Sequence, residues 1–207
     1  ASSSRLASGA NPRRDPHSPQ VNLGVVGHSF AAGELVRHAS RYGSGRIARR
    51  LFLAPAATPY LSRSDDNPLG LDPALFDANR AVIARSFPDW AEANAAPYFL
   101  PDTSRAIKDW TLGMMLQTSL QAALELNRIQ VSTDFRAELA RIDRPALVIH
   151  GDCDASAPLE LTGRPTAALI PGAQLVVYEG APHGLYFTHQ ERLNRDLAAF
   201  ASGRTAR

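Results

Sequence analysis

The chain has 207 residues, of which 44% are hydrophobic and 20% are charged, and this composition suits one globular domain with a substantial core. Its formal net charge of +2 and its scattered arginines argue against nucleic acid as a partner, because nucleic-acid sites gather basic residues on one face. No apolar run approaches the roughly 18 residues of a membrane span, so we expect no membrane partner either.

The single cysteine, Cys153, excludes an intramolecular disulfide and a metal cluster built on cysteine and histidine. No signal-peptide pattern precedes residue 20. Together these features predict a cytoplasmic protein that holds no metal.

The first elements in chain order are a tail, a strand and a helix. Residues 1–20 are rich in Ser, Pro and Arg and have no apolar period, which predicts a disordered N-terminal tail. Val21–Val26 is an apolar run of strand length, and its pattern predicts burial on both faces, as in a parallel sheet. Ala31–Tyr42 has apolar residues at helical spacing, and Gly43 is placed to end that helix.

Three further strands are predicted, at Arg49–Pro55, Ala146–His150 and Gln174–Tyr178. Strands that alternate with helices favour an α/β fold with a mostly parallel sheet, flanked by helices. Between the second and third strands the pattern is helical, which predicts a helical cap inserted at about residues 62–135. The large apolar side chains of this cap are expected to be core residues, some of them lining an apolar pocket: Phe87, Trp90, Tyr98, Phe99, Trp110, Met114 and Met115.

A last helix is predicted near the end of the chain. Thr188–Glu191, with the sequence THQE, has the form of a capping box, in which the hydroxyl and the carboxylate each bind a free amide at the helix start. Apolar residues at helical spacing follow. We therefore assign residues 21–201 to one domain and residues 202–207 to a C-terminal tail.

Gly27–Ala31 has the sequence GHSFA, in which small residues stand two positions before and after a serine. On a turn from a strand to a helix this pattern is typical of a nucleophile elbow. The serine, Ser29, needs a strained backbone there so that its hydroxyl stands clear of the sheet. Because a helix starts immediately afterwards, the backbone N–H of Phe30 is expected to stabilise an oxyanion.

A nucleophilic serine needs a base, and the base needs an acid that orients it. His183 follows the fourth strand and is the expected base. Asp152 and Asp154 both follow the third strand, at the edge where functional groups of parallel sheets gather, and one of the two is expected to have only a turn role. The chain order of serine, aspartate and histidine is that of α/β-hydrolases.

These motifs resemble the α/β-hydrolases, and in particular the branch of cofactor-free haloperoxidases and arylesterases. The resemblance is carried by residues 27–61, 65–72, 133–158 and 170–200, and it extends over about residues 21–201. It implies a partial α/β-hydrolase fold with a helical cap.

The resemblance also implies a role for each site residue. Ser29 would be the nucleophile, His183 the base and Asp154 the acid, because the acid of this branch follows its glycine by three residues, in G-x-x-D. The implied function is hydrolysis of small carboxylic esters without a cofactor. Hydrogen peroxide could replace water in a perhydrolase or haloperoxidase side reaction.

The sequence departs from that branch in two places. Ala31 and Ala32 stand where the branch usually has glycines, which crowds the turn. The branch also has strands before its elbow and a second oxyanion amide there, and residues 1–28 contain no such segment. The alternative hypothesis is therefore a truncated, catalytically impaired module without an enzymatic role. Its first strand would be an exposed edge, which favours a homo-oligomer.

Overall fold

The computed structural model of the chain describes residues 23–204. Outside the described residues lie the predicted tail at residues 1–20, Val21 and Asn22 of the predicted first strand, and the last three residues of the predicted C-terminal tail. No helix within the described part is long and apolar enough to cross a membrane.

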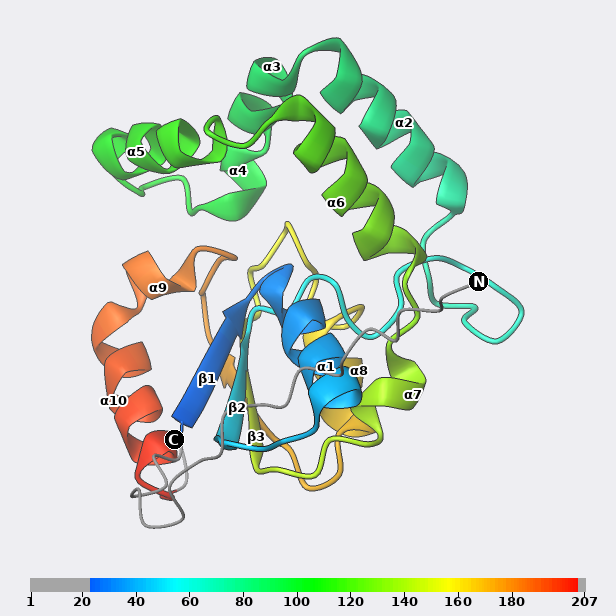
Figure 1. Cartoon of the computed structure of the whole chain (residues 1–207). Coiled ribbons are helices and arrows are strands. Elements are labelled where there is room, and N and C mark those ends of the chain that lie inside the picture. Colours follow the sequence, from blue (N-terminus) through cyan, green and yellow to red (C-terminus); the bar gives the residue numbers. More distant parts are fainter. Residues whose placement is uncertain (1–22, 205–207) are drawn as a thin grey trace, which may run out of the picture.

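A parallel sheet of four strands organises the described chain. Its strands are β1 (Leu23–His28), β2 (Ile47–Leu53), β3 (Ala146–Gly151) and β4 (Gln174–Tyr178), and they lie side by side in the order β1-β2-β3-β4. Each pair of neighbouring strands is joined by a segment that contains helix, as a parallel pairing requires (Figure 1). The predicted α/β fold with a parallel sheet is confirmed.

The strand bounds differ from the predicted ones where pairing extends beyond the apolar run. Strand β1 continues through Gly27 and His28, which lie opposite Phe52 and Leu53 of β2. Strand β2 ends two residues earlier than predicted, because Ala54 turns away with a φ of 42°.

Helices cover both faces of the sheet (Figure 1). On one face lie α1 (Ala31–Tyr42), α7 (Arg136–Leu139) and α8 (Gly163–Leu169), and on the other lie α9 (Leu185–Thr188) and α10 (Gln190–Ala201). Alternate residues of the strands enter the two cores: Leu51, Leu53, Leu147 and Ile149 face α9 and α10, whereas Phe52, Ala146 and Val148 face α1 and α7.

One predicted helix end agrees with the structure and one does not. Helix α1 has its predicted bounds, and Gly43 ends it with a φ of 69°. The predicted capping box at Thr188–Glu191 is wrong. Thr188 is the last residue of α9, its hydroxyl is 2.8 Å from His189 Nδ1, and α10 begins without a side-chain cap.

The helical cap lies over the carboxyl ends of the strands (Figure 1). Its helices are α2 (Pro73–Arg85), α3 (Phe87–Ala93), α4 (Ala95–Tyr98), α5 (Arg105–Met115) and α6 (Leu120–Ser132). Four of them begin at a side-chain oxygen that accepts a hydrogen bond from a helix-start amide, which fixes where each helix starts. These capping residues are Asp72, Ser86, Ser104 and Ser119.

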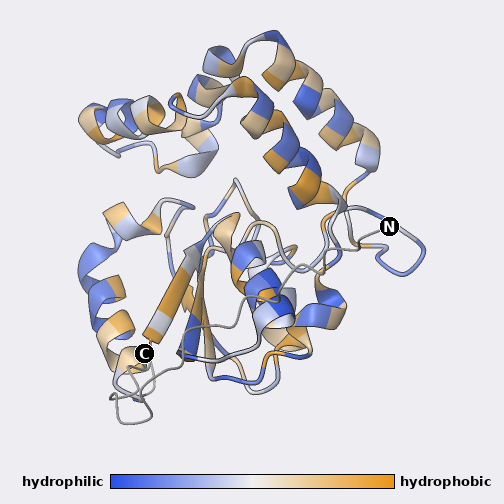
Figure 2. Ribbon diagram, in the orientation of Figure 1, coloured by the Kyte–Doolittle hydropathy of each residue, from blue (hydrophilic) through white to orange (hydrophobic). Residues whose placement is uncertain are grey.

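Some of the large apolar side chains of the cap are more exposed than the sequence predicted. Figure 2 shows that the strands are largely hydrophobic, whereas cap helices such as α6 carry both kinds of residue. Phe87 and Phe99 are buried as expected, but Trp110 is 57% exposed and Met114 is 41% exposed. The expectation that these two side chains belong to the core is wrong, because α5 lies at the outside of the cap (Figure 1).

Strand β1 is an edge of the sheet within the described residues, since β2 is its one neighbouring strand there. The predicted burial of this strand on both faces is wrong. Leu23 is 43% exposed and Val26 is 52% exposed, although both are apolar. An exposed apolar edge presents unpaired backbone groups to which another chain can add.

The turn from β1 into α1 is tight and strained. Ser29 has a φ of 56°, a conformation that costs a non-glycine residue of order 1–3 kcal/mol. The preceding Gly27 makes room for this turn, because a Cβ built there would lie 2.7 Å from the backbone oxygen of Ala31 and 2.9 Å from Leu35 Cδ1. A glycine at position 27 is therefore a requirement of packing.

The exposed edge generates a first prediction. We expect the chain to self-associate with increasing concentration, and we expect Val26→Lys to reduce this association, because a charged side chain on an edge strand opposes pairing with another chain. Light scattering over a concentration series measures the effect. Val82→Lys, which adds the same charge at an exposed position on α2, serves as the control. A mean mass that is independent of concentration, or that both variants lower equally, would contradict the prediction.

A second prediction concerns the tight turn. We expect Gly27→Ala to lower the free energy of unfolding by about 1–3 kcal/mol, since the added methyl group forces the backbone of α1 to shift. Gly24→Ala in the same strand is the matched control, because a Cβ there meets nothing within 4 Å. Urea unfolding followed by circular dichroism compares the two, and equal loss of stability would show that the turn tolerates the methyl group.

Candidate active site

Three side chains from separate parts of the chain meet at the carboxyl edge of the sheet. Ser29 follows β1, Asp154 follows β3 and His183 follows β4. His183 Nε2 lies 2.9 Å from Ser29 Oγ, and His183 Nδ1 lies 2.7 Å from Asp154 Oδ2. The structure thus brings the three sequence-predicted side chains into one continuous chain of hydrogen bonds.

The hydrogen-bond partners determine how protons are placed along this chain. An ionised carboxylate only accepts, so Asp154 requires the proton of His183 on Nδ1. Nε2 of a neutral His183 then carries a lone pair and accepts from the hydroxyl of Ser29. This arrangement leaves Nε2 ready to receive the serine proton.

Asp154 remains ionised despite being buried. Burial by itself would raise its pKa, but hydrogen bonds from His150, His183 and the backbone N–H of Ala157 outweigh burial and lower the pKa to about 2. The N–H groups of Ser156 and Ala157 donate to Oδ1 at 3.0 and 2.7 Å, which fixes the carboxylate plane. The group is therefore a permanent anion at neutral pH.

The other candidate carboxylate, Asp152, has different partners. Its Oδ1 accepts from the backbone N–H of Gly180 at 2.7 Å, and the residue is exposed. This contact ties the turn after β4 to the turn after β3. Asp152 also raises the pKa of the neighbouring Cys153 thiol, which disfavours a thiolate there.

Two histidines that the sequence analysis did not single out also belong to the site. His150 is fully buried, and its Nε2 lies 2.8 Å from the carbonyl oxygen of Ala157 and 3.1 Å from Asp154 Oδ2. His28 Nε2 lies 3.2 Å from the backbone oxygen of His183. Burial, followed by the neighbouring His183, lowers the pKa of His28 to about 4, so it is neutral at pH 7. The available signal was position, because His28 is the last residue of β1, directly before Ser29, and His150 is the second-last residue of β3, four residues before Asp154.

The backbone around Ser29 is held from both sides. Its N–H donates to the oxygen of Leu53 at 2.9 Å, and its carbonyl accepts from the N–H groups of Ala32 and Ala56 at 3.2 Å. The N–H of Phe30, the predicted oxyanion donor, has no hydrogen-bond partner among the described residues. It stands at the start of α1, where the helix dipole favours negative charge.

A cavity of about 330 Å³ lies between the sheet edge and the helical cap, and both Ser29 and His183 line it. Apolar side chains form much of its wall, as predicted. Among the described residues, no Asp, Glu, Lys or Arg lines the cavity. The cavity wall also carries amide side chains, which the sequence analysis missed because no sequence pattern marks them. The amides are Asn79, Asn94, Asn127 and Gln130.

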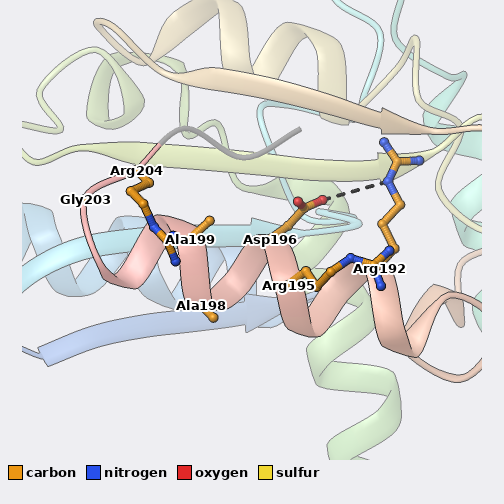
Figure 3. Close-up of a pocket in the computed structure, with 7 residues that line it drawn as sticks. All are labelled: Arg192, Arg195, Asp196, Ala198, Ala199, Gly203 and Arg204. Atoms are coloured by element: carbon orange, nitrogen blue, oxygen red, sulfur yellow. Dashed lines mark ion pairs between the residues drawn. The ribbon is translucent and has the colours of Figure 1, made fainter.

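A second hollow runs along α10 (Figure 3). It measures about 1020 Å³ and is lined by Arg192, Arg195, Asp196 and Arg204, together with Ala198, Ala199 and Gly203. Asp196 accepts from the hydroxyl of Tyr178 at 2.6 Å, and the guanidinium of Arg192 lies 4.0 Å from the centre of the Tyr178 ring. The described residues that line it include no serine or histidine, so the smaller cavity is the candidate active site.

Comparison with known proteins agrees with the fold. A non-heme chloroperoxidase of Kitasatospora aureofaciens is 33% identical over 183 residues, which cover 85% of this chain and 66% of that protein. A non-heme chloroperoxidase of Streptomyces lividans is 36% identical over 183 residues, covering 84% of this chain and 65% of that protein. The chain thus spans about two thirds of the length of these relatives.

The solved structure of a bromoperoxidase from Bacillus anthracis superposes with a TM-score of 0.82 at 30% identity, covering 87% of this chain and 67% of that one. Residues 6–196 match the alpha/beta hydrolase family. The chain therefore belongs to the alpha/beta hydrolase family.

Proposed function

We propose that this protein is a serine hydrolase of small carboxylic esters. The observation that carries the proposal is the chain of hydrogen bonds from Asp154 through His183 to Ser29, at 2.7 and 2.9 Å, at the wall of a neutral cavity. A relative named as a bifunctional esterase/perhydrolase, from Acinetobacter calcoaceticus and 29% identical over 84% of this chain, also supports it.

In the proposed mechanism Ser29 Oγ attacks the ester carbonyl carbon while His183 Nε2 takes the hydroxyl proton. Asp154 stabilises the resulting imidazolium, since its carboxylate is ionised at neutral pH. The N–H of Phe30 donates to the oxyanion. When the tetrahedral intermediate collapses, His183 returns the proton to the leaving alkoxide, which departs as the alcohol.

The acyl group then remains on Ser29 as an ester. A water molecule attacks the same carbonyl carbon, now in the acyl-enzyme, and gives one proton to His183. When the second tetrahedral intermediate collapses, His183 returns that proton to Ser29 Oγ and the acid is released. Hydrogen peroxide in place of water would yield a peracid, which can oxidise a halide. Each of these steps uses groups of the chain and a small nucleophile, so the proposed reaction needs no cofactor.

Covalent labelling tests the proposal. We expect a fluorophosphonate probe to modify Ser29 and no other serine, because among residues 23–204 only this serine hydroxyl is bound to a histidine that is oriented by a carboxylate. Mass spectrometry of a digest locates the adduct. Ser29→Ala should abolish labelling and Ser40→Ala, at an exposed position of α1, should not. A folded protein that takes no label would support the alternative of a module without an enzymatic role.

The two aspartates give a further prediction. We expect Asp154→Asn to reduce kcat for an aryl ester on the order of 10⁴-fold, because an amide cannot hold the required histidine tautomer. Asp152→Asn should change kcat little, since its contact is with a turn amide. Steady-state kinetics on both variants, with circular dichroism to verify folding, measures the difference. The reverse ranking would assign the orienting role to Asp152.

A further inference from the structure

Three asparagine side chains from three elements of the helical cap line the same cavity as Ser29 and His183. Asn79 belongs to α2, Asn94 is the C-cap residue of α3, and Asn127 belongs to α6. Each is half-buried. The cap therefore contributes polar groups to a cavity whose remaining wall is largely apolar.

The hydrogen-bond partners of Asn79 and Asn127 determine how each side-chain amide is oriented. Trp90 Nε1 donates to Asn79 Oδ1 at 2.9 Å, and the guanidinium of Arg80 donates to Asn127 Oδ1 at 3.3 Å. Tryptophan and arginine side chains can only donate, so the carboxamide oxygens must point toward them. The Nδ2 groups are left as donors, and neither has an acceptor among the described residues.

Gln130 is the contrasting case at the same wall. Its Nε2 donates to the carbonyl oxygen of Ala56 at 3.2 Å, so its donor end is already used to hold α6 against the loop after β2. Asn79 and Asn127 have the opposite arrangement, with the acceptor used and the donor free. Their donors are therefore available to a bound molecule.

The charge of the wall limits what these donors bind. Among the described residues, no lysine or arginine lines the cavity, so a carboxylate would lose its hydration without a cation to compensate. A neutral oxygen, such as that of an ether, ketone or hydroxyl, loses less hydration and accepts from an N–H donor. The wall thus favours a neutral acceptor.

We propose that the cavity selects esters whose acyl chain carries a second, neutral oxygen acceptor, which binds Nδ2 of Asn79 and Asn127. This inference rests on the proposed function, because the acyl chain stays attached to Ser29 Oγ in the acyl-enzyme and must occupy the cavity that Ser29 lines. Asn79 and Asn127 are then residues that determine specificity, without any part in the bond changes.

Pairs of p-nitrophenyl esters test the proposal. The two members of a pair have acyl chains of equal length, and in one member an ether oxygen replaces one methylene group of the other. The pairs are 3-methoxypropanoate with pentanoate, 4-methoxybutanoate with hexanoate, and 5-methoxypentanoate with heptanoate. For at least one pair we expect a higher kcat/KM for the ether ester. Asn127→Leu and Asn79→Leu should each lower the ratio of ether to alkyl kcat/KM by about 3- to 10-fold, the effect of one net hydrogen bond.

The ratio is measured within one protein preparation, so a partly unfolded variant lowers both rates and leaves the ratio intact. Asn194→Leu, an exposed position of α10 outside the cavity, is the matched control and should keep the wild-type ratio. An unchanged ratio in both cavity variants for all three pairs would overturn the proposal. Failure of the proposed function looks different, because Ser29→Ala would then leave the hydrolysis of every ester unchanged.

Discussion

The backbone turn at Ser29 is the constraint on which the candidate site depends. A serine with a φ of 56° is held there because the surrounding structure determines it from several sides. Leu53 and Ala56 bind its backbone from the β2 side, and Ala32 binds it from α1. The close approach of α1 to Gly27 allows the helix to begin two residues after the serine. Consequently the hydroxyl of Ser29 and the N–H of Phe30 are positioned by sheet and helix rather than by a mobile loop.

The second constraint is the buried charge of Asp154. Its two oxygens receive hydrogen bonds from two backbone amides and two histidines, and these contacts keep the carboxylate ionised although it is buried. His150 reaches it from within β3 and sits against α8, where a Cβ at Gly163 would lie 2.3 Å from its Nδ1. The strand, the following loop and a helix thus fix the group that orients His183.

Sequence reasoning located the elements of the site because each has a local pattern. The elbow sequence lies between a strand and a helix, and His183 and Asp154 follow strands, so the topology of a parallel sheet brings them to one edge. The assignment of Asp154 over Asp152 came from resemblance, since both carboxylates follow the same strand. Their different partners, His183 and Gly180, depend on the path of two loops that no local pattern specifies.

The parts that sequence could not supply depend on packing between distant segments. An apolar strand looks the same whether one or two neighbours flank it, so the exposure of Val26 could not be read from its pattern. Helical spacing also gave no means of telling Trp90, which lines the cavity, from Trp110, which is largely exposed. The orientation of Asn79 required knowledge that Trp90, eleven residues away, is its donor.

The helical cap has a structural link to the proposed chemistry beyond enclosing the cavity. The carbonyl oxygen of Tyr98 accepts from the N–H of Gly184 at 2.9 Å, and its hydroxyl lies 2.6 Å from that of Tyr186. A Cβ at Gly184 would lie 3.0 Å from the rings of Tyr98 and Phe99, so the loop that carries His183 packs directly under α4. A displacement of the cap would therefore change the position of His183 as well as the shape of the cavity. In the proposed mechanism, substrate binding and proton transfer would therefore depend on the same contacts between α4 and the loop that carries His183.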